Sequence, residues 1–259
     1  MGLVRPKKHL GQHFLKDESI CKKIALLYSE KSESNILLEI GPGMGALTKH
    51  LIKPEKIDLF CIEYDIESVN FLHENINLSK DHIIHGDFLK LELDNLFLNK
   101  NFGVIGNFPY NISSQILFKC LDYKNQINQV IGMFQKEVAE RICAGPGSKT
   151  YGILSVLMQA YYDVEYCFTI DETAFTPPPK VKSAVIKCIR NKEKELPCDE
   201  REFKFIVKTA FNQRRKTLRN ALKSIYNKPE KEFPFQQKRA EQLSVDDFIS
   251  LCLFISENK

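Results

Sequence analysis

The regular alternation of short apolar runs with helical stretches constrains the fold of this chain most. Runs rich in β-branched and aromatic residues recur at 35–41, 57–65, 82–87, 102–110 and 129–134. Segments with helical spacing follow most of them, for example 46–52, 66–76 and 113–123. Strands that alternate with helices form βαβ units, which assemble into a largely parallel sheet covered by helices on both faces. We therefore predict an α/β fold with a doubly wound sheet.

Two more strand-like runs, at 163–170 and 183–190, are joined by a segment without helical spacing. This segment contains three consecutive prolines, Pro177 to Pro179, and proline bars regular structure. We expect the two runs to pair antiparallel at one edge of the sheet.

The composition changes beyond Arg190. The stretch 191–200 is charged and is interrupted by Pro197, as is typical of a linker. After it come only helix-like segments, at 201–211, 214–225 and 245–256. We predict two domains: an α/β domain over residues 1–190 and a small all-helical domain over residues 191–259.

The net charge of +4 is unevenly distributed. Residues 1–190 carry 22 basic and 22 acidic side chains, whereas residues 191–259 carry 15 and 11. Within 203–225 there are seven lysines or arginines and no acid. Such a cluster can be a solvated helix face, but uncompensated like charges repel one another. The pattern therefore favours a polyanionic partner.

Other classes of protein are excluded by simpler features. No run approaches the 18 apolar residues of a membrane span, and the basic N-terminus lacks the apolar segment of a secretory signal. We expect a cytoplasmic protein with no membrane partner. The eight cysteines are scattered without a C-x-x-C pair, which favours reduced thiols. The pairs His9 with His13 and His82 with His85 lack a third ligand, so no metal is predicted.

A glycine-rich loop follows the first strand, in the sequence GPGMG at 41–45. Glycines allow a tight turn and a close approach of the backbone to a ligand, and a helix N-terminus favours electronegative groups. Glu63 lies 22 residues after Gly41 at the end of the second strand, where an acid binds ribose hydroxyls in nucleotide-binding sheets. A glycine loop alone is weak evidence of this function, but the position of Glu63 strengthens it.

Asp87 ends the third strand and Asn107 the fourth. Asp87 could accept a hydrogen bond from an adenine amine, or it could simply cap a helix. Four successive strands thus carry polar or glycine residues at their carboxyl ends, where open α/β sheets bind ligands. An adenosine-containing cofactor fits this edge. A nicotinamide dinucleotide should leave a pyrophosphate fingerprint, whereas S-adenosylmethionine needs only ribose, adenine and amino-acid contacts.

The sequence IGNFPYNI at 105–112 ends the fourth strand abruptly. It can be a plain turn, because Asn and Pro are turn formers. It can also hold a target adenine whose N6 is a poor nucleophile. The Asn107 side chain and the Phe108 carbonyl would accept the N6 hydrogens, Pro109 would fix the backbone, and Tyr110 would stack on the base. Phe175 could stack on its other side or serve as a core residue.

Several motifs together resemble the ribosomal RNA adenine dimethyltransferase family. They occur in order as GQHFL (11–15), LEIGPGMGALT (38–48), GNFPYNISS (106–114), FTPPPKVKSAV (175–185) and FNQRRKTLRNAL (211–222). The resemblance implies a Rossmann-like class I S-adenosylmethionine-dependent methyltransferase with a helical RNA-binding domain. It also implies N6,N6-dimethylation of two adjacent adenosines near the 3′ end of 16S rRNA, within the small ribosomal subunit or its precursor. We expect a monomer.

By the same resemblance, the expected cofactor contacts are His13, Leu15, Gly41, Glu63, Asp87 and Asn107. The expected phosphate contacts are Arg214, Arg215, Lys216 and Arg219. The chain departs from the family pattern at two positions: His13 stands where Asn is usual, and Phe108 stands where Leu is usual.

Three alternatives stay open at this point. The related macrolide-resistance methyltransferases share the catalytic core but modify one adenosine of large-subunit rRNA. An RNA-binding assembly factor could have lost catalysis, although the intact GPGMG, Glu63, Asp87 and Asn107 argue against this. A nicotinamide dehydrogenase has only the glycine loop and Glu63 in its favour.

Overall fold

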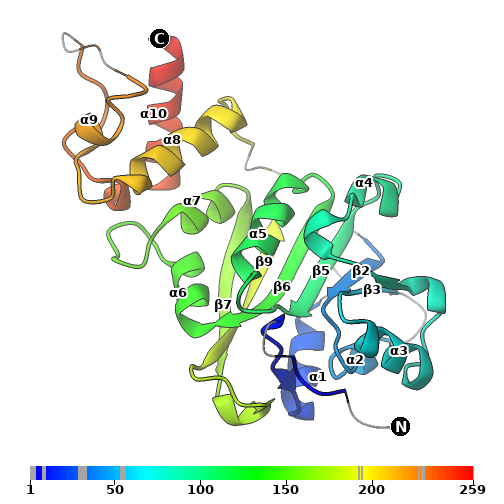
Figure 1. Ribbon diagram of the computed structural model, residues 1–259. Helices are drawn as coiled ribbons and strands as arrows, with labels where there is room; N and C mark the ends of the chain where they lie inside the picture. The colour runs from blue at the N-terminus through cyan, green and yellow to red at the C-terminus, as the bar shows by residue number, and fades with distance from the viewer. Residues whose placement is uncertain are drawn as a thin grey trace. The chain divides into compact units, whose positions relative to one another are not determined.

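The computed structural model describes residues 4–7, 10–28, 34–52, 57–191, 193, 195–226, 228 and 231–258 (Figure 1). The chain forms two compact units. The first comprises Met1–Ala139 and Glu165–Arg190, and the second comprises Glu140–Val164 and Asn191–Lys259. No described helix is long and apolar enough to cross a membrane.

A seven-stranded sheet forms the centre of the first unit, in the order β4-β3-β2-β5-β6-β9-β7. The strands are β2 (Ile36–Ile40), β3 (Asp58–Glu63), β4 (Ile83–His85), β5 (Phe102–Asn107), β6 (Ile127–Gln135), β7 (Tyr162–Ile170) and β9 (Ser183–Arg190). Strands β2 to β6 pair in parallel, and β9 pairs antiparallel with β6. The predicted mainly parallel sheet is therefore confirmed, with β9 and β7 neighbours at one edge.

The helices of the first unit are mostly short, and two of the longest have aspartate caps. They are α1 (Glu18–Leu27), α2 (Thr48–Leu51), α3 (Ile66–Asn75), α4 (Leu93–Leu96) and α5 (Ser113–Asp122), with 3₁₀ helices η2 (Lys80–His82), η3 (Phe88–Lys90) and η4 (Glu172–Ala174). Asp17 and Asp65 cap α1 and α3 by accepting backbone N–H groups. Helix α6 (Lys136–Cys143) and strand β7 each belong partly to both units.

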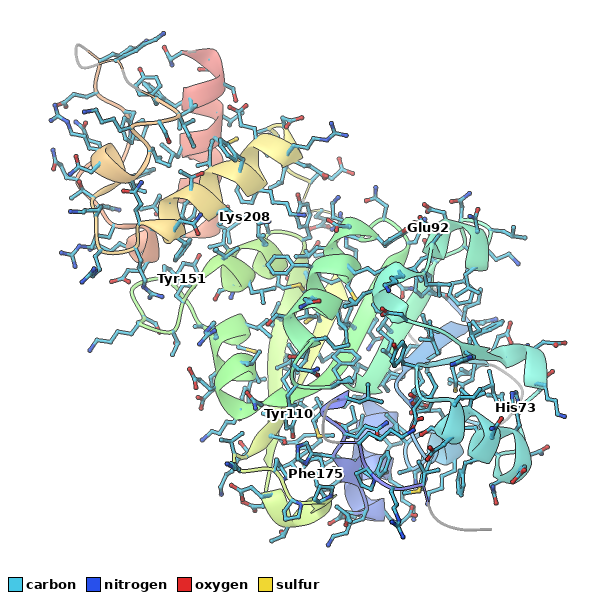
Figure 2. All side chains as sticks on the ribbon, in the orientation of Figure 1. His73, Glu92, Tyr110, Tyr151, Phe175 and Lys208 are labelled. Carbon is cyan, nitrogen blue, oxygen red and sulfur yellow. The ribbon has the colours of Figure 1, made fainter. Side chains whose placement is uncertain are left out.

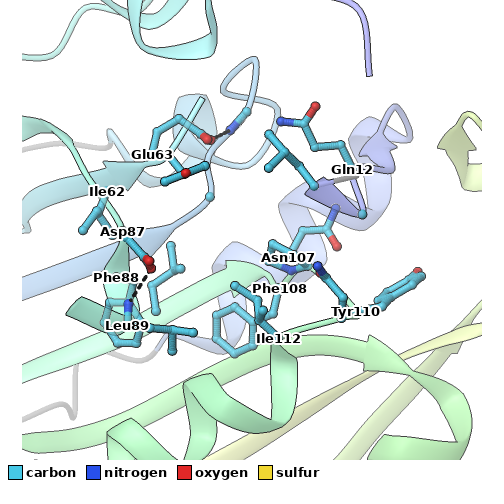
Figure 3. Close-up of a pocket in the computed structure, with 18 of the residues that line it drawn as sticks. Gln12, Ile62, Glu63, Asp87, Phe88, Leu89, Asn107, Phe108, Tyr110 and Ile112 are labelled. Atoms are coloured by element: carbon cyan, nitrogen blue, oxygen red, sulfur yellow. Dashed lines mark hydrogen bonds between the residues drawn. The ribbon is translucent and has the colours of Figure 1, made fainter. Parts of the chain in front are cut away.

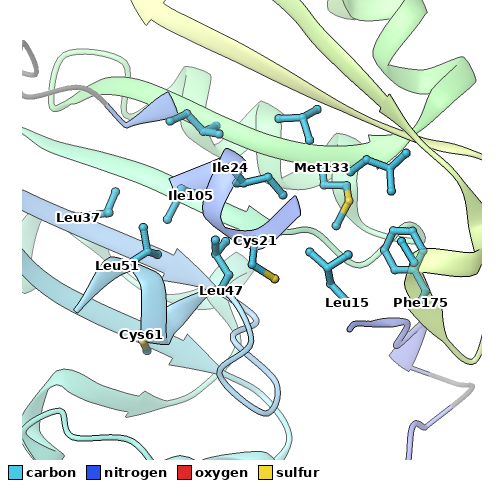
Figure 4. Close-up of a cluster of buried hydrophobic side chains, with 14 of the residues drawn as sticks. Leu15, Cys21, Ile24, Leu37, Leu47, Leu51, Cys61, Ile105, Met133 and Phe175 are labelled. Carbon is cyan, nitrogen blue, oxygen red and sulfur yellow. The ribbon is translucent and has the colours of Figure 1, made fainter. Parts of the chain in front are cut away.

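Both faces of the central strands are buried, which explains why their sequences are almost continuously apolar. On one face, Leu37 and Ile105 belong to a cluster with Ile24 of α1 (Figure 4). The alternate residues Leu38 and Val104 are fully buried as well. The sheet is thus rigidly embedded, and the ends of its strands provide fixed positions for functional side chains.

A two-stranded ladder joins the N-terminal segment to the proline-rich loop. Strand β1 (Phe14–Leu15) pairs antiparallel with β8 (Phe175–Thr176). Sequence analysis predicted no element in either segment, and α1 was also missed. A ladder of two residues from distant parts of the chain leaves no periodic signal.

The second unit is helical. It contains α7 (Ile153–Gln159), α8 (Glu200–Asn212), α9 (Leu218–Ala221), α10 (Val245–Glu257) and the 3₁₀ helix η5 (Ala240–Gln242). Two of the predicted helical segments correspond to α8 and α10. The third, 214–225, was predicted at full length but contains only the four-residue α9. The N–H groups of Leu218 and Arg219 donate to the carbonyls of Lys238 and Gln236, so these groups bond to another segment instead of extending a helix.

Residues 140–164 belong to the second unit, whereas the sequence analysis placed the whole of 1–190 in one domain. Long-range contacts explain the difference. The N–H of Gly147 donates to the carbonyl of Glu241 over 2.7 Å, and the Arg214 guanidinium donates to the carbonyl of Lys149 over 2.6 Å. Tyr151 packs edge-on against Phe211 of α8, with ring centroids 6.1 Å apart. Such contacts cannot be inferred from local composition.

Candidate active site

A pocket of about 230 Å³ lies where β2, β3, β4 and β5 end in the first unit (Figure 3). Carboxyl ends of parallel strands meet at one edge of a sheet, so residues distant in sequence converge there. The lining includes five of the six predicted cofactor residues: His13, Gly41, Glu63, Asp87 and Asn107. It also includes all four predicted catalytic residues: Asn107, Phe108, Pro109 and Tyr110.

The glycine loop after β2 forms one wall of the pocket. Gly41 and Gly43 have φ values of +66° and +56°, in a region that L side chains rarely adopt. A Cβ atom at Gly43 would also lie 2.8 Å from the ring of Phe14. Both conformation and space therefore require glycine at position 43, and the bare backbone can approach a bound molecule closely.

Glu63 at the end of β3 is held by main-chain donors. One carboxylate oxygen accepts the N–H of Gly43 over 3.0 Å, and the other accepts the N–H of Asp65 over 2.8 Å. The side chain is buried, and burial raises its pKa above the ordinary value. Each oxygen keeps a further lone pair, which suits hydroxyl donors such as those of a ribose.

Asp87 follows β4 and caps η3. Its Oδ1 accepts the N–H of Leu89 over 2.9 Å, so the capping role considered from the sequence is present (Figure 3). The carboxylate has a second oxygen, Oδ2, which lies 3.9 Å from the ammonium of Lys90. Asp87 can therefore cap η3 with one oxygen and accept from an exocyclic amine with the other. Its predicted contact with the adenine of the cofactor stays a prediction.

Asn107 at the end of β5 has a defined orientation. Its Nδ2 donates to the main-chain carbonyl of His13 over 2.8 Å. A carbonyl can only accept, so this bond determines which end of the amide is nitrogen. Oδ1 forms no hydrogen bond within the described ranges and is left as an acceptor.

Tyr110 is positioned by two neighbours. Its hydroxyl lies 2.6 Å from Oγ of Ser183, and its ring stacks on that of His13 with centroids 5.4 Å apart and planes at 24°. The Nδ1 atom of His13 lies 2.8 Å from the carbonyl of Pro177 and therefore carries the proton. Partial burial raises the pKa of Tyr110, which keeps its hydroxyl protonated.

Two predicted residues do not line the pocket. Leu15 and Phe175, of the paired strands β1 and β8, are 5% and 1% exposed and belong to the hydrophobic cluster (Figure 4). Phe175 thus takes the core position that was one of its two alternatives. Tyr110 and Phe175 both belong to the first unit (Figure 2). Tyr110 lines the pocket, but the ring of Phe175 does not.

Gln12 and Tyr64 are among the lining residues that sequence analysis missed. Gln12 accepts the N–H of Lys7 over 2.8 Å, and the Lys7 ammonium pairs with Asp65 over 2.5 Å, which holds the N-terminal segment at the pocket. Tyr64 is 61% exposed. The available signals were the place of Gln12 in the GQHFL motif and the place of Tyr64 directly after Glu63.

The four predicted RNA-binding residues differ in their surroundings. Arg214 is partly buried, pairs with Glu241 over 2.6 Å and also donates to the carbonyls of Ser148 and Lys149. The expectation that every cation of 203–225 is uncompensated is therefore wrong for Arg214, because its partner lies outside that segment. Arg215, Lys216 and Arg219 are exposed and form no ion pair with a carboxylate of the described residues.

The donor set of the pocket fits an adenosine-containing sulfonium cofactor. A close-packed glycine backbone, a buried carboxylate for hydroxyls and a second carboxylate at the next strand end all face one pocket. In the part of the chain that the structure covers, no three His, Cys, Asp or Glu side chains could hold a metal ion. The Rossmann-like sheet and this edge define a class I S-adenosylmethionine-dependent methyltransferase.

Comparison with known proteins identifies the family. The chain matches the sequence profile of ribosomal RNA adenine dimethylase over residues 4–257 and belongs to that family. It is 59% identical to ribosomal RNA small subunit methyltransferase A of Parabacteroides distasonis, over 98% of this chain and 95% of that protein. It is 57% identical to the protein of the same name from Flavobacterium johnsoniae, over 97% and 96%.

Solved structures of other proteins have the same fold over most of the chain. A dimethyladenosine transferase of Plasmodium falciparum superposes with a TM-score of 0.79 and 26% identity, covering 95% of this chain and 98% of that one. The 23S rRNA methyltransferase ErmE superposes with a TM-score of 0.70 at 21% identity, over 94% and 99%, and shows the shared fold. The chain is thus an S-adenosylmethionine-dependent rRNA adenine dimethyltransferase, and the nicotinamide alternative is set aside.

Proposed function

We propose that this enzyme dimethylates N6 of two adjacent adenosines near the 3′ end of 16S rRNA during maturation of the small ribosomal subunit. The observation that carries the proposal is the oriented amide of Asn107, which lies in the same pocket as the glycine loop and Glu63. The names of the 59% and 57% identical relatives support the small subunit as the target. We further propose that it acts in the cytoplasm as a monomer.

The cofactor would be held by the lining of the pocket. The backbone at Gly41 and Gly43 would approach the amino-acid part, Glu63 would accept ribose hydroxyls, and Asp87 would accept from the adenine amine. His13 would contribute through its position beside Asn107. When bound, S-adenosylmethionine supplies an electrophilic methyl group on its sulfonium. Leu15 would support this site from the core rather than by side-chain contact.

The target base needs its N6 lone pair exposed. Oδ1 of Asn107 and the main-chain carbonyl of Phe108 would accept the two N6 hydrogens and aim the lone pair along one direction. Such fixed acceptors act mainly by orientation and by electrostatic preorganisation. No general base is needed during attack, because the methylated ammonium is strongly acidic and loses its proton to solvent afterwards. A second round then acts on an amine with one hydrogen fewer.

Tight packing supports a precise position for the Phe108 carbonyl. The Phe108 ring is fully buried and packs edge-on against Phe134, with centroids 5.3 Å apart. A Cβ atom at Gly132 would lie 2.4 Å from this ring, so the glycine creates the space that phenylalanine needs at a position where leucine is usual. Pro109, with its fixed φ, limits the backbone further.

Tyr110 would stack on the target base through the face opposite His13. The hydrogen bond to Ser183 and the His13 ring hold its plane, so little conformational entropy is lost when a base stacks. In the second unit, which would serve as the RNA-binding domain, Arg215, Lys216 and Arg219 would contact phosphates. Arg214 would mainly hold the loop at 148–149 that carries its carbonyl acceptors.

One experiment tests the reaction and its target together. The full-length protein is incubated with labelled S-adenosylmethionine and small subunits from cells that lack this modification, with large subunits as the control. Dimethyladenosine at two adjacent positions near the 16S 3′ end is the expected product. Label on large subunits alone would favour a resistance-type enzyme, and label on neither would favour an assembly factor without catalysis.

A further inference from the structure

The second unit has a basic cavity of its own, with a volume of about 200 Å³. Four cations line it, namely Arg219, Lys223, Lys228 and Lys231, together with the single carboxylate of Glu232. None of the four cations forms an ion pair with a carboxylate in the described part of the chain. Among the described residues, the lining therefore carries an excess of positive charge.

Two of the lysines are ordered without being neutralised. Lys228 donates to the main-chain carbonyl of Asn258, and Lys231 donates to the side-chain oxygen of the same residue, at the C-terminal end of α10. The Lys231 ammonium also lies 5.6 Å from the centre of the Phe254 ring. Amide oxygens and an aromatic face restrict the side chains but leave each full charge in place. The lysines are thus partly preorganised for an anion.

Tyr226 provides an independent indication of a ligand. Its side chain is 5% exposed and lines the cavity, yet its buried hydroxyl has no hydrogen-bond partner among the described residues. Phe233 and Phe254 pack edge-on against its ring, at 5.6 and 5.8 Å between centroids. A buried polar group without a partner is costly and rare. An acceptor oxygen in the cavity would supply the missing partner.

Main-chain hydrogen bonds connect two of the segments that line the cavity. The N–H of Arg219 donates to the carbonyl of Gln236 over 2.9 Å, and the N–H of Leu218 donates to the carbonyl of Lys238 over 2.8 Å. These bonds join α9 to the segment that carries Lys231 and Phe233. Arg219 is therefore tied through its main chain to that segment.

We propose that this cavity binds a phosphate group, with the Tyr226 hydroxyl as donor and Arg219, Lys223, Lys228 and Lys231 as counter-charges. A phosphate offers several acceptor oxygens and a negative charge, which are the two features that this cavity leaves unmatched. The favoured source is a phosphodiester of the rRNA substrate, so the inference rests on the proposed function. A free phosphate ion has the same chemistry and is separated from RNA by the experiment.

The first test removes charge from the cavity. In the full-length protein, Lys223→Gln and Lys231→Gln are combined, and the matched control combines Lys80→Gln and Lys100→Gln, which are exposed positions of the first unit. Binding to a transcript of the 3′ domain of 16S rRNA is measured from 50 to 200 mM salt. We expect the cavity variant to bind about tenfold more weakly, with a salt slope smaller by roughly one to two. The control should stay within about twofold.

The second test removes only one oxygen. Tyr226→Phe should weaken RNA binding about three- to tenfold, because the donor to the phosphate is lost. Its melting temperature without RNA should be equal to or above that of the unsubstituted protein, because an unpaired buried hydroxyl disappears. A merely structural tyrosine would leave RNA affinity unchanged, so an unchanged Kd would exclude an rRNA phosphodiester as the ligand of Tyr226.

A third arm separates the two sources of phosphate. The melting temperature of the protein is followed with inorganic phosphate at constant ionic strength. If phosphate stabilises the unsubstituted protein but not the cavity variant, while RNA binding is equal in both, the site takes a small phosphate ion. If neither RNA nor phosphate distinguishes cavity variant from control, the proposal is overturned. Methylation of small subunits by the unsubstituted protein, measured separately, shows whether the proposed function itself has failed.

Discussion

The active-site pocket differs from the basic face of the second unit in how its side chains are held. The basic face is formed by Arg215, Lys216 and Arg219. In the pocket, main-chain atoms hold the key side chains: His13 O holds Asn107, and the N–H of Gly43 holds Glu63. On the basic face the side chains are exposed, and none pairs with a carboxylate of the described residues. One region specifies positions, and the other supplies charge.

This difference reflects what each task needs. Catalysis by orientation requires acceptors placed to within about half an ångström, so each group is individually important. Binding to a phosphate backbone is a sum of screened interactions, in which each cation contributes a part. Substitutions in the pocket should therefore have large and specific effects, and substitutions on the basic face should have small and cumulative ones.

Among these substitutions, we expect Asn107→Ala to have the largest effect, on the rate of methyl transfer. Loss of the oriented Oδ1 acceptor should lower the rate of methyl transfer by about 10²- to 10³-fold, as for loss of an oxyanion-hole donor. The affinity for RNA should change by less than about twofold, because no phosphate contact is removed. Single-turnover methylation and filter binding measure the two quantities. An unchanged rate would remove Asn107 from the chemistry.

Glu63→Gln should weaken cofactor binding without changing RNA binding. The amide keeps one acceptor oxygen but cannot accept both the Gly43 and Asp65 N–H groups, so a buried donor loses its partner. We expect the Kd for S-adenosylmethionine to rise about 10- to 100-fold, measured by calorimetry. RNA affinity serves as the control. A Kd equal to that of the unsubstituted protein would show that Glu63 only shapes the loop.

Substitution of two neighbouring residues, Arg214→Ala and Arg215→Ala, separates an effect on stability from an effect on RNA binding. Arg214→Ala removes an ion pair with Glu241 and two bonds to carbonyls, so the free energy of unfolding should fall by about 1–3 kcal/mol. Arg215→Ala should leave stability within about 0.5 kcal/mol but weaken RNA binding by a few-fold and flatten its salt dependence. Denaturant unfolding and a salt titration distinguish them. The reverse pattern would refute these assignments.

The buried carboxyl of Glu39 should make the free energy of unfolding depend on pH. The exposed cations of the basic face should not have this effect. Burial raises the pKa of this β2 carboxyl to about 8, whereas its ordinary value is 4.5. Glu39 then binds more protons in the folded protein than in the unfolded chain between these values, so its contribution to stability is largest below about pH 4.5 and is lost as the pH rises toward 8. The slope contributed is at most about 1.4 kcal/mol per pH unit.

Glu39→Gln should remove this contribution and flatten the stability profile between pH 5 and 8. Because burial also raises the pKa of Glu63, the difference between variant and unsubstituted protein is the informative quantity. Urea unfolding at several pH values measures it. Parallel profiles would show that the Glu39 carboxyl has no raised pKa in the folded state.

The parts of the molecule that could be predicted from sequence are those that local sequence patterns determine. Strands β2 to β6 are apolar runs, and the proposed site residues Gly41, Glu63 and Asn107 directly follow or end them. Parallel pairing then brings these positions to one edge without any further information. Fold and pocket could therefore be predicted together.

The remainder depends on contacts between distant segments. Leu15 and Phe175 were expected at the ligand but are buried through a two-residue ladder. Glu241 neutralises Arg214 across 27 positions, which a count of charges in a window cannot detect. Only α9 forms within the predicted helix 214–225, because its backbone bonds to Gln236 and Lys238. Each of these outcomes is set by tertiary pairing rather than by propensity.

The bond from Asn107 to His13 has a consequence for how this enzyme can vary. Its acceptor is a peptide oxygen, an atom that all twenty amino acids carry. A codon change at position 13 can therefore replace the imidazole without deleting the contact that orients the amide. Histidine can therefore stand where the family resemblance leads us to expect asparagine, because the atom that orients the Asn107 amide does not belong to the side chain of residue 13.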